Sequence, residues 1–426
     1  MLWCKKYLRN HMQQREDTLW DVVVVGGGPA GMMAAGVAAA RGKKVLLLEK
    51  SKTLGKKLLI TGGGRCNVTN NKPDIREMLA KYKKSDKFLF SAFSQFGVAE
   101  ALQFFHDRGM QTKEENEGRM FPLSNSAQSV WDVLVREMQK HGVVVRTGAV
   151  VKHIAQKENI FSVVLQNGTE IAASACVVAV GGTSRPETGS TGDGYAWARA
   201  LGHKVIENDF ALVPVALHDA WAKRLGGVAL PDSKLTLMQD GKKQAVQKGK
   251  LLFTHFGISG PAVLNLSRTI GEFLGYGDVT LLLDLFPTTD PGGLKTQVQT
   301  LLVAESNKKI KNTLGSLVPK ALVPALLELA HIDGETPCHS VRSKERAVLV
   351  SLLKKIPLQV QGLLGADKAV VSSGGVVPEE VDFKTMQSRL VPNLFIVGDL
   401  LNIDRPSGGY SLQLCWTTGF IAGTHV

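Results

Sequence analysis

The chain has 426 residues, 44% of them hydrophobic, so it is long enough to form two or three domains with buried cores. No apolar run approaches the roughly 18 to 20 residues that a membrane-spanning helix needs, so we expect neither an integral membrane protein nor a membrane partner. The net charge of +13 is typical of proteins that bind polyanions, but a solvated lysine-rich surface explains it equally well.

The five cysteines predict neither a metal site nor a disulfide framework. They stand singly, without a C-x-x-C pair or histidines at ligand spacing: Cys4, Cys66, Cys176, Cys338 and Cys415. Residues 1–19 are basic but have no apolar core and no small-residue cleavage site, so they do not resemble a secretion signal. We therefore expect a cytoplasmic protein with free thiols and a basic N-terminal extension.

The chain after this extension predicts an α/β domain. Residues 21–25 and 44–48 form strands on either side of an alanine-rich helix, which gives a βαβ unit. Helical periodicity follows at 97–109 and 127–142. The second of these helices is expected to begin at Asn125 or Ser126, both of which are good N-caps.

The turn of the βαβ unit carries G-x-G-x-x-G, which predicts a dinucleotide site. Gly26 makes the tight turn, Gly28 lets a pyrophosphate approach the backbone, and Gly31 lets helix and sheet pack closely. Glu49 ends the second strand and is placed to accept hydrogen bonds from ribose hydroxyls, which disfavours a 2′-phosphate and so NADPH as the bound cofactor. The neighbouring Pro29, Ala30 and Lys50 belong to the same predicted site.

A β-meander follows, with a hairpin turn at Asn167-Gly168, and returns to a core strand at 177–180. We assign Val150 and the turn Gly181-Gly182 to the cofactor site. The glycine run 189–194 is expected beside the pyrophosphate or substrate pocket.

Beyond residue 203 the pattern changes to short apolar alternations, which predict an inserted antiparallel β domain at 204–289 plus 356–370. Residues 290–355 predict a small helical domain that Pro319 and Pro324 break into short helices. Strands resume in KAVVSSGGVV and LFIVGD, and a glycine-started helix closes the chain. The C-terminus therefore rejoins the first domain, which spans 20–203 plus 371–426.

The glycine clusters near the C-terminus favour FAD over NAD. Gly398 and Asp399 end a strand, and Gly409, Tyr410 and Ser411 begin a helix, an arrangement that suits a long, extended cofactor. Asp399 is expected to hold ribityl hydroxyls, while the amides at the helix start stabilise negative charge on the pyrimidine edge of a reduced flavin. A purely structural helix-terminal loop is the alternative.

At this point the sequence resembles the aminoacetone oxidase-like, or BaiN-like, NAD(P)/FAD-dependent oxidoreductases, a family that includes a bacterial ribosomal RNA dihydrouridine synthase. The resemblance runs in order from about Trp20 to the end. It rests on the βαβ motif with Glu49, LLITGGGRCNVTN (58–70), the Gly181-Gly182-Thr183 turn, LLFTHFGISGPA (251–262) and the GD…GGY terminus. It implies an α/β fold in which a discontinuous Rossmann-type FAD-binding domain carries an inserted β-barrel-like module and a small helical domain.

The chain departs from the family pattern near its end. The family usually has GE-x-x-D followed by GGYN, whereas this chain has Gly398-Asp399, Asn402 and Gly409-Tyr410-Ser411. Asp399 is a shorter carboxylate in the same role, so FAD binding is still expected. The inference of a particular substrate from the family is weakened.

The segment 58–70 is the strongest candidate for a wall beside the isoalloxazine ring. Its bare backbone, including Gly63 and Gly64, leaves room for close approach, while Arg65 and Asn67 supply donors. Cys66 is either the acid that protonates a substrate carbon or a small packing residue. His255 and Tyr410 are the other catalytic candidates, each with a structural alternative: a fixed turn for His255 and a packing aromatic for Tyr410.

We therefore predict an FAD-dependent oxidoreductase. Reduction of an unsaturated ring, with uridine in large-subunit ribosomal RNA as substrate, ranks first because two lysine groups are placed to contact phosphates: Lys81, Lys83, Lys84 and Lys87, and Lys242, Lys243, Lys248 and Lys250. An amine oxidase acting on an aminoacetone-like molecule and producing hydrogen peroxide ranks second, and a non-catalytic flavin redox sensor is the third reading. No second nucleotide half-site is present, so NAD(P)H is expected as a transient electron donor with ping-pong kinetics. The sequence leaves the oligomeric state open.

Overall fold

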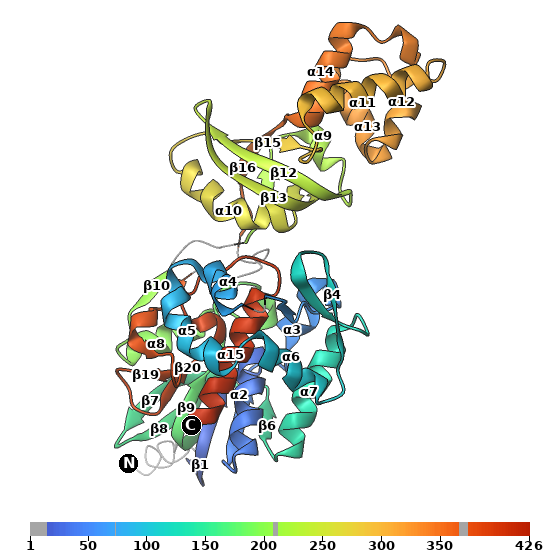
Figure 1. The fold of residues 1–426 in the computed structure, drawn as a ribbon. Helices are drawn as coiled ribbons and strands as arrows, with labels where there is room; N and C mark the ends of the chain where they lie inside the picture. The colour runs from blue at the N-terminus through green and yellow to red at the C-terminus, as the bar shows by residue number, and fades with distance from the viewer. Residues whose placement is uncertain (1–14, 73, 208–211, 366–373) are drawn as a thin grey trace, which may run out of the picture. The chain divides into compact units, whose positions relative to one another are not determined.

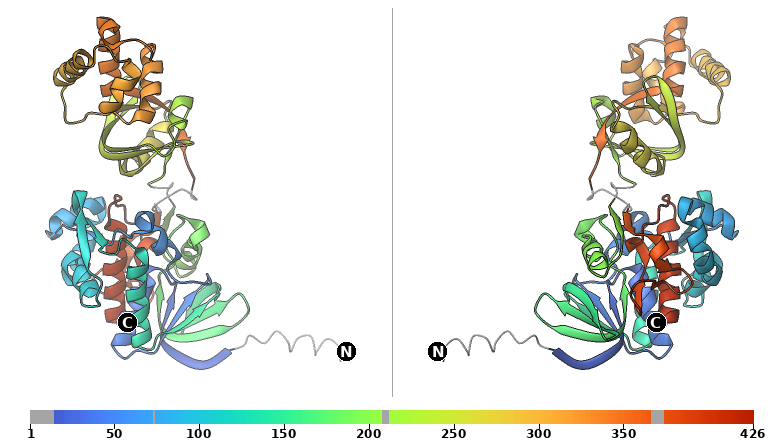
Figure 2. Two further views of the ribbon diagram at one scale, coloured as in Figure 1. Left: turned by 90° about the vertical axis from the view of Figure 1, so that its right-hand side faces the viewer. Right: turned by 90° about the vertical axis from the view of Figure 1, so that its left-hand side faces the viewer.

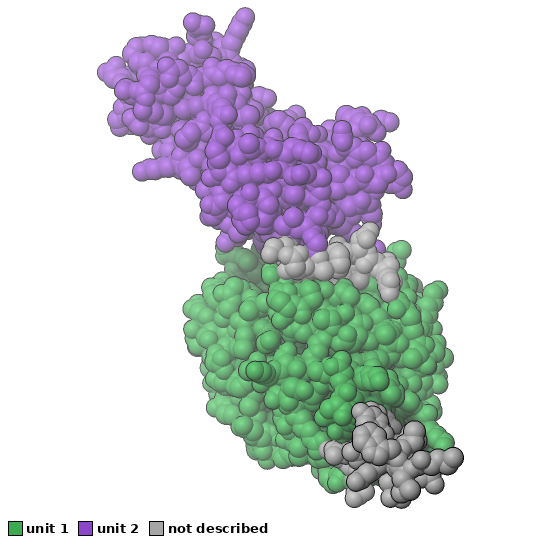
Figure 3. All heavy atoms as spheres, turned by 180° about the vertical axis from the view of Figure 1, so that it is seen from behind, with its two compact units in different colours: residues 1–209, 371–426 green, residues 210–370 purple. Residues whose placement is uncertain are grey.

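The computed structural model describes residues 15–72, 74–207, 212–365 and 374–426. They form two compact units, one of residues 1–209 and 371–426 and one of residues 210–370, coloured separately in Figure 3. The chain leaves the first unit and returns to it, as a discontinuous FAD-binding domain requires. Most of the predicted N-terminal extension and residues 368–373 of the predicted strand KAVVSSGGVV lie outside the described residues.

Unit 1 is built on a mainly parallel sheet with the strand order β20-β9-β1-β2-β6 at its centre (Figure 1). These strands are β1 (Arg15–Val25), β2 (Val45–Glu49), β6 (Val144–Thr147), β9 (Glu170–Val178) and β20 (Leu394–Ile396). Residues 22–25 and 45–48 are almost wholly buried, as expected of parallel strands covered on both faces. The first strand is longer than predicted because its outer half continues along β9, pairing Leu19 with Ala172.

An antiparallel meander extends the same sheet. Strands β7 (Val151–Lys157) and β8 (Ile160–Leu165) lead into the first half of β9. Asn167 and Gly168 form the turn, where Gly168 has a φ of +87° and the Asn167 side chain accepts a hydrogen bond from the Thr169 amide. The predicted hairpin is therefore confirmed. Strands β18 (Val381–Asp382) and β19 (Gln387–Ser388) lie at the other edge, next to β20.

Two helices far apart in sequence pack together on this sheet. They are α2 (Pro29–Ala40) and α15 (Tyr410–His425), which lie side by side in Figure 1 and in the turned views of Figure 2. Helix α7 (Ala127–Lys140) packs on the other side of α2, and the Ser126 hydroxyl caps it by accepting from the Gln128 amide. Of the two predicted caps, Ser126 is therefore the one used.

The remaining elements of unit 1 are short. Its helices include α3 (Lys56–Ile60), α4 (Ile75–Leu79), α5 (Asp86–Gln95), α6 (Val98–His106) and α8 (Asp193–Ala200). A small sheet has the order β3 (Thr69–Asn70), β5 (Arg119–Pro122), β4 (Thr112–Glu115), and β10 (Val205–Glu207) pairs with β17 (Gly374–Val376). Strand β10 thus belongs to unit 1, although residue 204 was the predicted start of the inserted module.

Unit 2 contains a closed barrel in the order β11-β14-β13-β12-β15-β16. Its strands are β11 (Val215–Leu217), β12 (Ala229–Gln239), β13 (Lys242–Thr254), β14 (Gly257–Ser259), β15 (Thr280–Asp284) and β16 (Ile356–Leu363). Alternating side chains, such as Leu235, Leu237 and Leu281, are fully buried. Helix α9 (Ala220–Lys223) follows β11, and helix α10 (Pro261–Leu274) packs against β13.

The helical part of unit 2 comprises α11 (Pro291–Ala304), α12 (Ile310–Thr313), α13 (Val323–Ala330) and α14 (Ser343–Lys354). Pro319 precedes a short 3₁₀ turn and Pro324 lies in the first turn of α13, so both prolines mark helix boundaries as predicted. The barrel and these helices share one buried hydrophobic cluster within a single compact unit, whereas the prediction divided them at residue 290. Among the described residues, no helix is both long and apolar enough to cross a bilayer.

A buried carboxylate joins the two parts of unit 2. Asp284 lies 2.9 Å from the ammonium groups of both Lys234 on β12 and Lys354 on α14, and its side chain is only 3% exposed. Burial alone would raise the pKa of Asp284, but the hydrogen bonds from Lys354 and Lys234 outweigh that effect and hold the pKa below its ordinary value.

We expect Asp284→Asn to destabilise unit 2 by about 3 kcal/mol, because two half-buried ammonium groups lose the buried carboxylate that pairs with them. The stability that Asp284 contributes is present above its ordinary pKa of 3.8 and is lost as the pH falls through the lowered value. Calorimetric unfolding of the whole chain at neutral and acidic pH measures both effects. Glu335→Gln is the control, since Glu335 pairs with Lys309 and Lys311 on the surface and should matter little. A wild-type melting temperature for the Asp284 variant would contradict the assignment.

Candidate functional site

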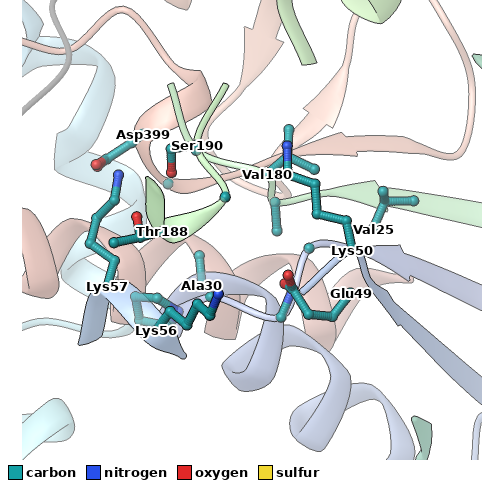
Figure 4. Close-up of a pocket in the computed structure, with 18 of the residues that line it drawn as sticks. Val25, Ala30, Glu49, Lys50, Lys56, Lys57, Val180, Thr188, Ser190 and Asp399 are labelled. Carbon is teal, nitrogen blue, oxygen red and sulfur yellow. The ribbon is translucent and has the colours of Figure 1, made fainter. Parts of the chain in front are cut away.

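A cavity opens where the parallel strands of unit 1 end, the place at which ligands bind in open α/β sheets. Val25, Ala179 and Val180 mark the ends of the two central strands in its wall. Figure 4 shows Lys57 and Asp399 on one side of the cavity and Glu49 and Lys50 on the other. The predicted residues that line it are Gly26, Gly28, Pro29, Ala30, Glu49, Lys50, Gly181, Gly398 and Asp399.

The three motif glycines are required for different reasons. A Cβ on Gly26 would lie 2.6 Å from the Ala179 carbonyl oxygen, and one on Gly31 would lie 1.9 Å from the Gly26 oxygen. These two glycines are therefore fixed by the protein's own packing. A Cβ on Gly28 would meet only that Ala179 oxygen, at 4.0 Å, and Gly28 has an ordinary φ of −79°. Nothing in the protein itself requires a glycine there, so the free space beside Gly28 fits a ligand that approaches the backbone.

The start of helix α2 supports the same conclusion. Gly28 is its N-cap, no side chain caps the first turn, and no acidic residue lies within that turn. The first amides of a helix need acceptors, and the helix dipole favours an anion at this end. A pyrophosphate supplies both the acceptors and the negative charge.

Glu49 is held rigidly at the end of β2. Its two carboxylate oxygens accept hydrogen bonds from the amides of Gly27 at 2.8 Å and Ser51 at 2.7 Å. Each oxygen keeps a further lone pair, so the carboxylate can still accept from ribose hydroxyls at the cavity wall. Lys50, in contrast, turns to helix α8, where its ammonium group pairs with Asp193 at 2.7 Å.

Several polar groups of this cavity were not named individually from the sequence, although two of them lie in the glycine run 189–194 that was expected beside the pocket. They are Lys56, Lys57, Thr188, Ser190, Asp193 and the thiol of Cys415. Lys57 donates to the backbone oxygen of Ser184 at 2.8 Å, and burial lowers its pKa. Three of the residues not named individually follow the Gly181-Gly182 turn, in or next to the glycine run already expected near the pyrophosphate. The pair Lys56-Lys57 directly after Gly55 is the one sequence feature that could have indicated the two lysines of the cavity.

Other predicted residues do not line this cavity: Gly31, Gly63, Gly64, Arg65, Cys66, Asn67, Val150, Gly182, Gly409, Tyr410 and Ser411. Val150 lies between two residues that do, Ala149 and Val151. The carbonyl oxygen of Gly182 accepts from the Gly192 amide, which ties the glycine run to the strand end.

The predicted loops at 58–70 and 408–411 meet each other, although more than 330 residues separate them. The Asn70 side chain donates to the Gly408 oxygen at 3.1 Å, and Thr69 donates to Gln413 of α15 at 2.6 Å. A Cβ on Gly409 would lie 2.4 Å from the carbonyl carbon of Thr69, and Gly409 has a φ of +102°. Only glycine fits at this crossing, so the two family motifs form one structural feature.

Within the loop, Gly62, Gly63 and Gly64 all have positive φ, which explains three consecutive glycines by backbone conformation. The Arg65 guanidinium pairs with Glu115 at 2.7 Å and stacks on Phe121, so it is already engaged within the protein. The side-chain oxygen of Asn67 is buried without a hydrogen-bond partner among the described residues. Such an unpaired acceptor is a candidate ligand contact.

The two neighbouring catalytic candidates both retain their protons. Cys66 is fully buried with a φ of +60°, and burial raises the pKa of its thiol to about 12. Tyr410 is 6% exposed at the start of α15, and burial raises the pKa of its hydroxyl. Its backbone oxygen accepts from the buried Tyr82 hydroxyl at 2.8 Å. His255 lies in unit 2, exposed in the turn between β13 and β14.

Residues 20–425 match the family described as HI0933-like protein Rossmann domain. The chain belongs to this family. Two curated relatives agree with the HI0933-like assignment. The 3-dehydro-bile acid delta(4,6)-reductase of Clostridium scindens is 32% identical over 88% of this chain and 90% of its own length. The ribosomal RNA dihydrouridine synthase of Escherichia coli is 32% identical over 87% of this chain and 89% of its own length.

Solved structures share the fold of this HI0933-like chain at low sequence identity. A 3-ketosteroid-delta4-(5alpha)-dehydrogenase from Rhodococcus jostii is 16% identical with a TM-score of 0.55, covering 97% of this chain and 99% of that one. A 3-ketosteroid delta1-dehydrogenase from Sterolibacterium denitrificans is 14% identical with a TM-score of 0.55, covering 96% and 99%. These likenesses concern the fold alone.

The chain is an FAD-dependent oxidoreductase of the HI0933-like family. The predicted family, fold class and cofactor class are therefore confirmed. The residues present fit FAD: the space at Gly28 and the uncapped helix suit its pyrophosphate, and Glu49 suits its adenosine ribose. Within the described ranges, no three His, Cys, Asp or Glu side chains gather as metal ligands.

We expect Gly28→Ala to weaken FAD binding at least tenfold while the cofactor-free protein melts at the wild-type temperature, because the added methyl group enters only ligand space. Gly31→Ala should instead destabilise the protein itself by about 2 kcal/mol, since its methyl group overlaps the Gly26 oxygen. Flavin fluorescence titration and thermal unfolding separate the two effects. Unchanged FAD affinity in the Gly28 variant would show that the pyrophosphate lies elsewhere.

Proposed function

We propose that this chain reduces a carbon–carbon double bond conjugated to a carbonyl group, with NAD(P)H as the electron donor. The observation that carries the proposal is that two relatives, each 32% identical over most of both chains, are named for saturating such bonds. A delta(4,6)-reductase of a 3-dehydro-bile acid and a synthase of dihydrouridine both add two hydrogens beside a carbonyl. The balanced reaction takes the substrate, NAD(P)H and one proton to the saturated product and NAD(P)⁺.

FAD, when bound, supplies hydride transfer in such a reaction. The chain's own residues must then hold the cofactor, exclude water and keep a proton for the carbon next to the carbonyl. Cys66 and Tyr410 both keep their protons at neutral pH because burial raises the pKa of each. We rank Tyr410 first as the donor because a general acid must reach its substrate and Tyr410 keeps a small exposed fraction of 6%, whereas Cys66 has none.

Uridine in large-subunit ribosomal RNA is the substrate that we rank first. Besides the net charge of +13, the segment 80–87 of unit 1 presents four exposed ammonium groups, those of Lys81, Lys83, Lys84 and Lys87. The same segment is anchored to the start of α15, because the buried Tyr82 hydroxyl donates to the Tyr410 oxygen. Phe90, in the helix that follows, is 48% exposed. Cations with an exposed aromatic beside them suit a single-stranded RNA.

The two other readings of the sequence are less well supported. A redox-sensing thiol needs a lowered pKa and access to solvent, and the Cys66 thiol has neither. A small cationic amine would be repelled by the positive surface, and neither of the two relatives is named as an amine oxidase. An aminoacetone arm in the experiment below keeps that alternative testable.

The proposal is tested under anaerobic conditions with the purified flavoprotein. Reduction of the flavin by NADPH or NADH, followed by addition of unmodified large-subunit ribosomal RNA, should restore the oxidised flavin spectrum and yield dihydrouridine. A conjugated enone steroid and aminoacetone are added in separate reactions. If the enone steroid reoxidises the flavin and RNA does not, the proposed reaction class is kept and RNA is rejected as the substrate. Reduction of the oxidised enzyme by aminoacetone, with peroxide formed in air, would overturn the proposal.

The lysine segment supplies a matched comparison in the same experiment. Replacing Lys81, Lys83, Lys84 and Lys87 by Gln should reduce the slope of log affinity against log salt for RNA by about 3, since roughly 0.7 counterions are released per phosphate contact. Reduction of a small enone should not change. The control replaces the barrel lysines Lys242, Lys243, Lys248 and Lys250 in the same way. Equal losses in both variants would mean that charge alone, not this segment, attracts RNA.

We also expect Tyr410→Phe to lower turnover about 100-fold while FAD remains bound, because the proton donor is lost. Cys66→Ala should stay within a few-fold of wild type. The rate limited by Tyr410 should be constant through neutral pH and fall only as the pH rises toward its raised pKa, since the hydroxyl must be protonated to donate. Single-turnover flavin reoxidation measures each rate. The opposite ranking of the two variants would assign the proton to the thiol.

A further inference from the structure

Arg405 is a buried cation in the loop between the Gly398 turn and helix α15. Its side chain is 1% exposed. A guanidinium cannot lose its proton in a protein, so its charge must be compensated where it lies. Sequence analysis gave Arg405 no role, because an arginine in a polar loop reads as a surface residue.

Three hydrogen bonds fix this guanidinium. It donates to the Asp399 carboxylate, to the Ile403 carbonyl oxygen at 2.6 Å and to the Ser411 hydroxyl at 3.0 Å. Asp399 lines the cavity, and Ser411 lies in the first turn of α15. Arg405 therefore ties the cavity wall to the start of the last helix, where the loop 58–70 also attaches.

Arg405 compensates the charge of the Asp399 carboxylate at this side of the cavity. Arg405 forms an ion pair with Asp399, and the carboxylates of Asp399 and Glu187 both act on Lys57, which lies beside Asp399 in Figure 4. Burial lowers the pKa of Lys57, and the charge of Asp399 partly restores it. The first turn of α15 adds the positive end of a 16-residue helix that has no side-chain cap. Because Arg405 compensates Asp399 and the first turn of α15 lies next to it, this side can accept a ligand that becomes more negative.

We infer that Arg405 is the positioning residue of the cofactor loop: it fixes Asp399 in the cavity wall and supplies the positive charge that stabilises FAD in its reduced state. Without Arg405, Asp399 would face the cavity as an unpaired carboxylate and would disfavour the extra electrons of a reduced flavin. This role concerns the cofactor and does not depend on which substrate the enzyme reduces.

Two substitutions separate position from charge. Arg405→Gln removes the charge, so it should weaken binding of oxidised FAD about tenfold. It should weaken binding of reduced FAD about tenfold more than that. This difference lowers the two-electron midpoint potential of the bound flavin by about 30 mV. Arg405→Lys keeps the charge but loses the planar donor fork. It should weaken FAD binding while the midpoint potential stays near wild type.

Both quantities are measured without substrate, by flavin fluorescence titration and by equilibration with a redox dye. Arg108→Gln is the matched control, because Arg108 is another arginine of unit 1, paired with Glu137 at 2.8 Å and remote from the described cavity lining. It should change neither value. Wild-type affinity and potential in Arg405→Gln, with only a lower melting temperature, would overturn the inference. If Arg405→Gln does not fold, the test rests on Arg405→Lys. A lowered midpoint potential of the flavin, or an unchanged affinity for FAD, in that variant would overturn the inference.

Discussion

Unit 1 depends on a direct contact between the backbones of its first and last long helices. A Cβ on Gly419 would lie 2.4 Å from the Ala30 oxygen, and one on Gly423 would lie 2.5 Å from the Ala34 oxygen, so α15 approaches α2 as closely as only glycine permits. Gly398 lies beside the same contact, where its amide donates to Thr418 and its own added Cβ would be 3.1 Å from Ala30. Side chains at these positions would push the C-terminal loop away from the glycine turn.

That contact explains how residues from both ends of the chain share one cavity. The turn after β1 provides open space and unpaired amides for an anion, and the segment around Asp399 provides the opposite wall. The buried polar groups there are held by specific partners: Glu49 by two amides, Lys57 by Ser184 and Asp399 by Arg405. A site with so many fixed dipoles needs little rearrangement when a charged cofactor binds.

Much of the fold could be predicted because local signals and long-range packing agree. Gly26, Gly28 and Gly31 stand after an apolar strand, Asn167-Gly168 marks a hairpin, and Pro319 and Pro324 mark helix boundaries, each through its own backbone chemistry. Alternating apolar residues predicted the antiparallel β domain, and the family resemblance implied that it is barrel-like. The start of β1 was not predicted, because Arg15 to Leu19 are held by pairing with β9 and not by their own composition.

The site was less predictable where side chains find partners far along the chain. Arg65 was expected to be available to the cofactor, but Glu115, fifty residues away, binds it. Arg405 is buried and Lys57 is largely enclosed, and only the tertiary structure shows this. Residue type indicates which chemistry is possible, whereas burial and pairing decide which group remains free for a ligand.

The discontinuous first unit also fixes an order of events during synthesis. Residues 210–370 are continuous and carry their own hydrophobic cluster, so they can fold as soon as they leave the ribosome. The strand β20 and helix α15 that complete the sheet and the cavity are made only afterwards. Until then α2 lacks its contact with α15, and β9 lacks its pairing with β20. Completion of the cavity wall by Gly398, Asp399 and Cys415 is therefore a late step of synthesis.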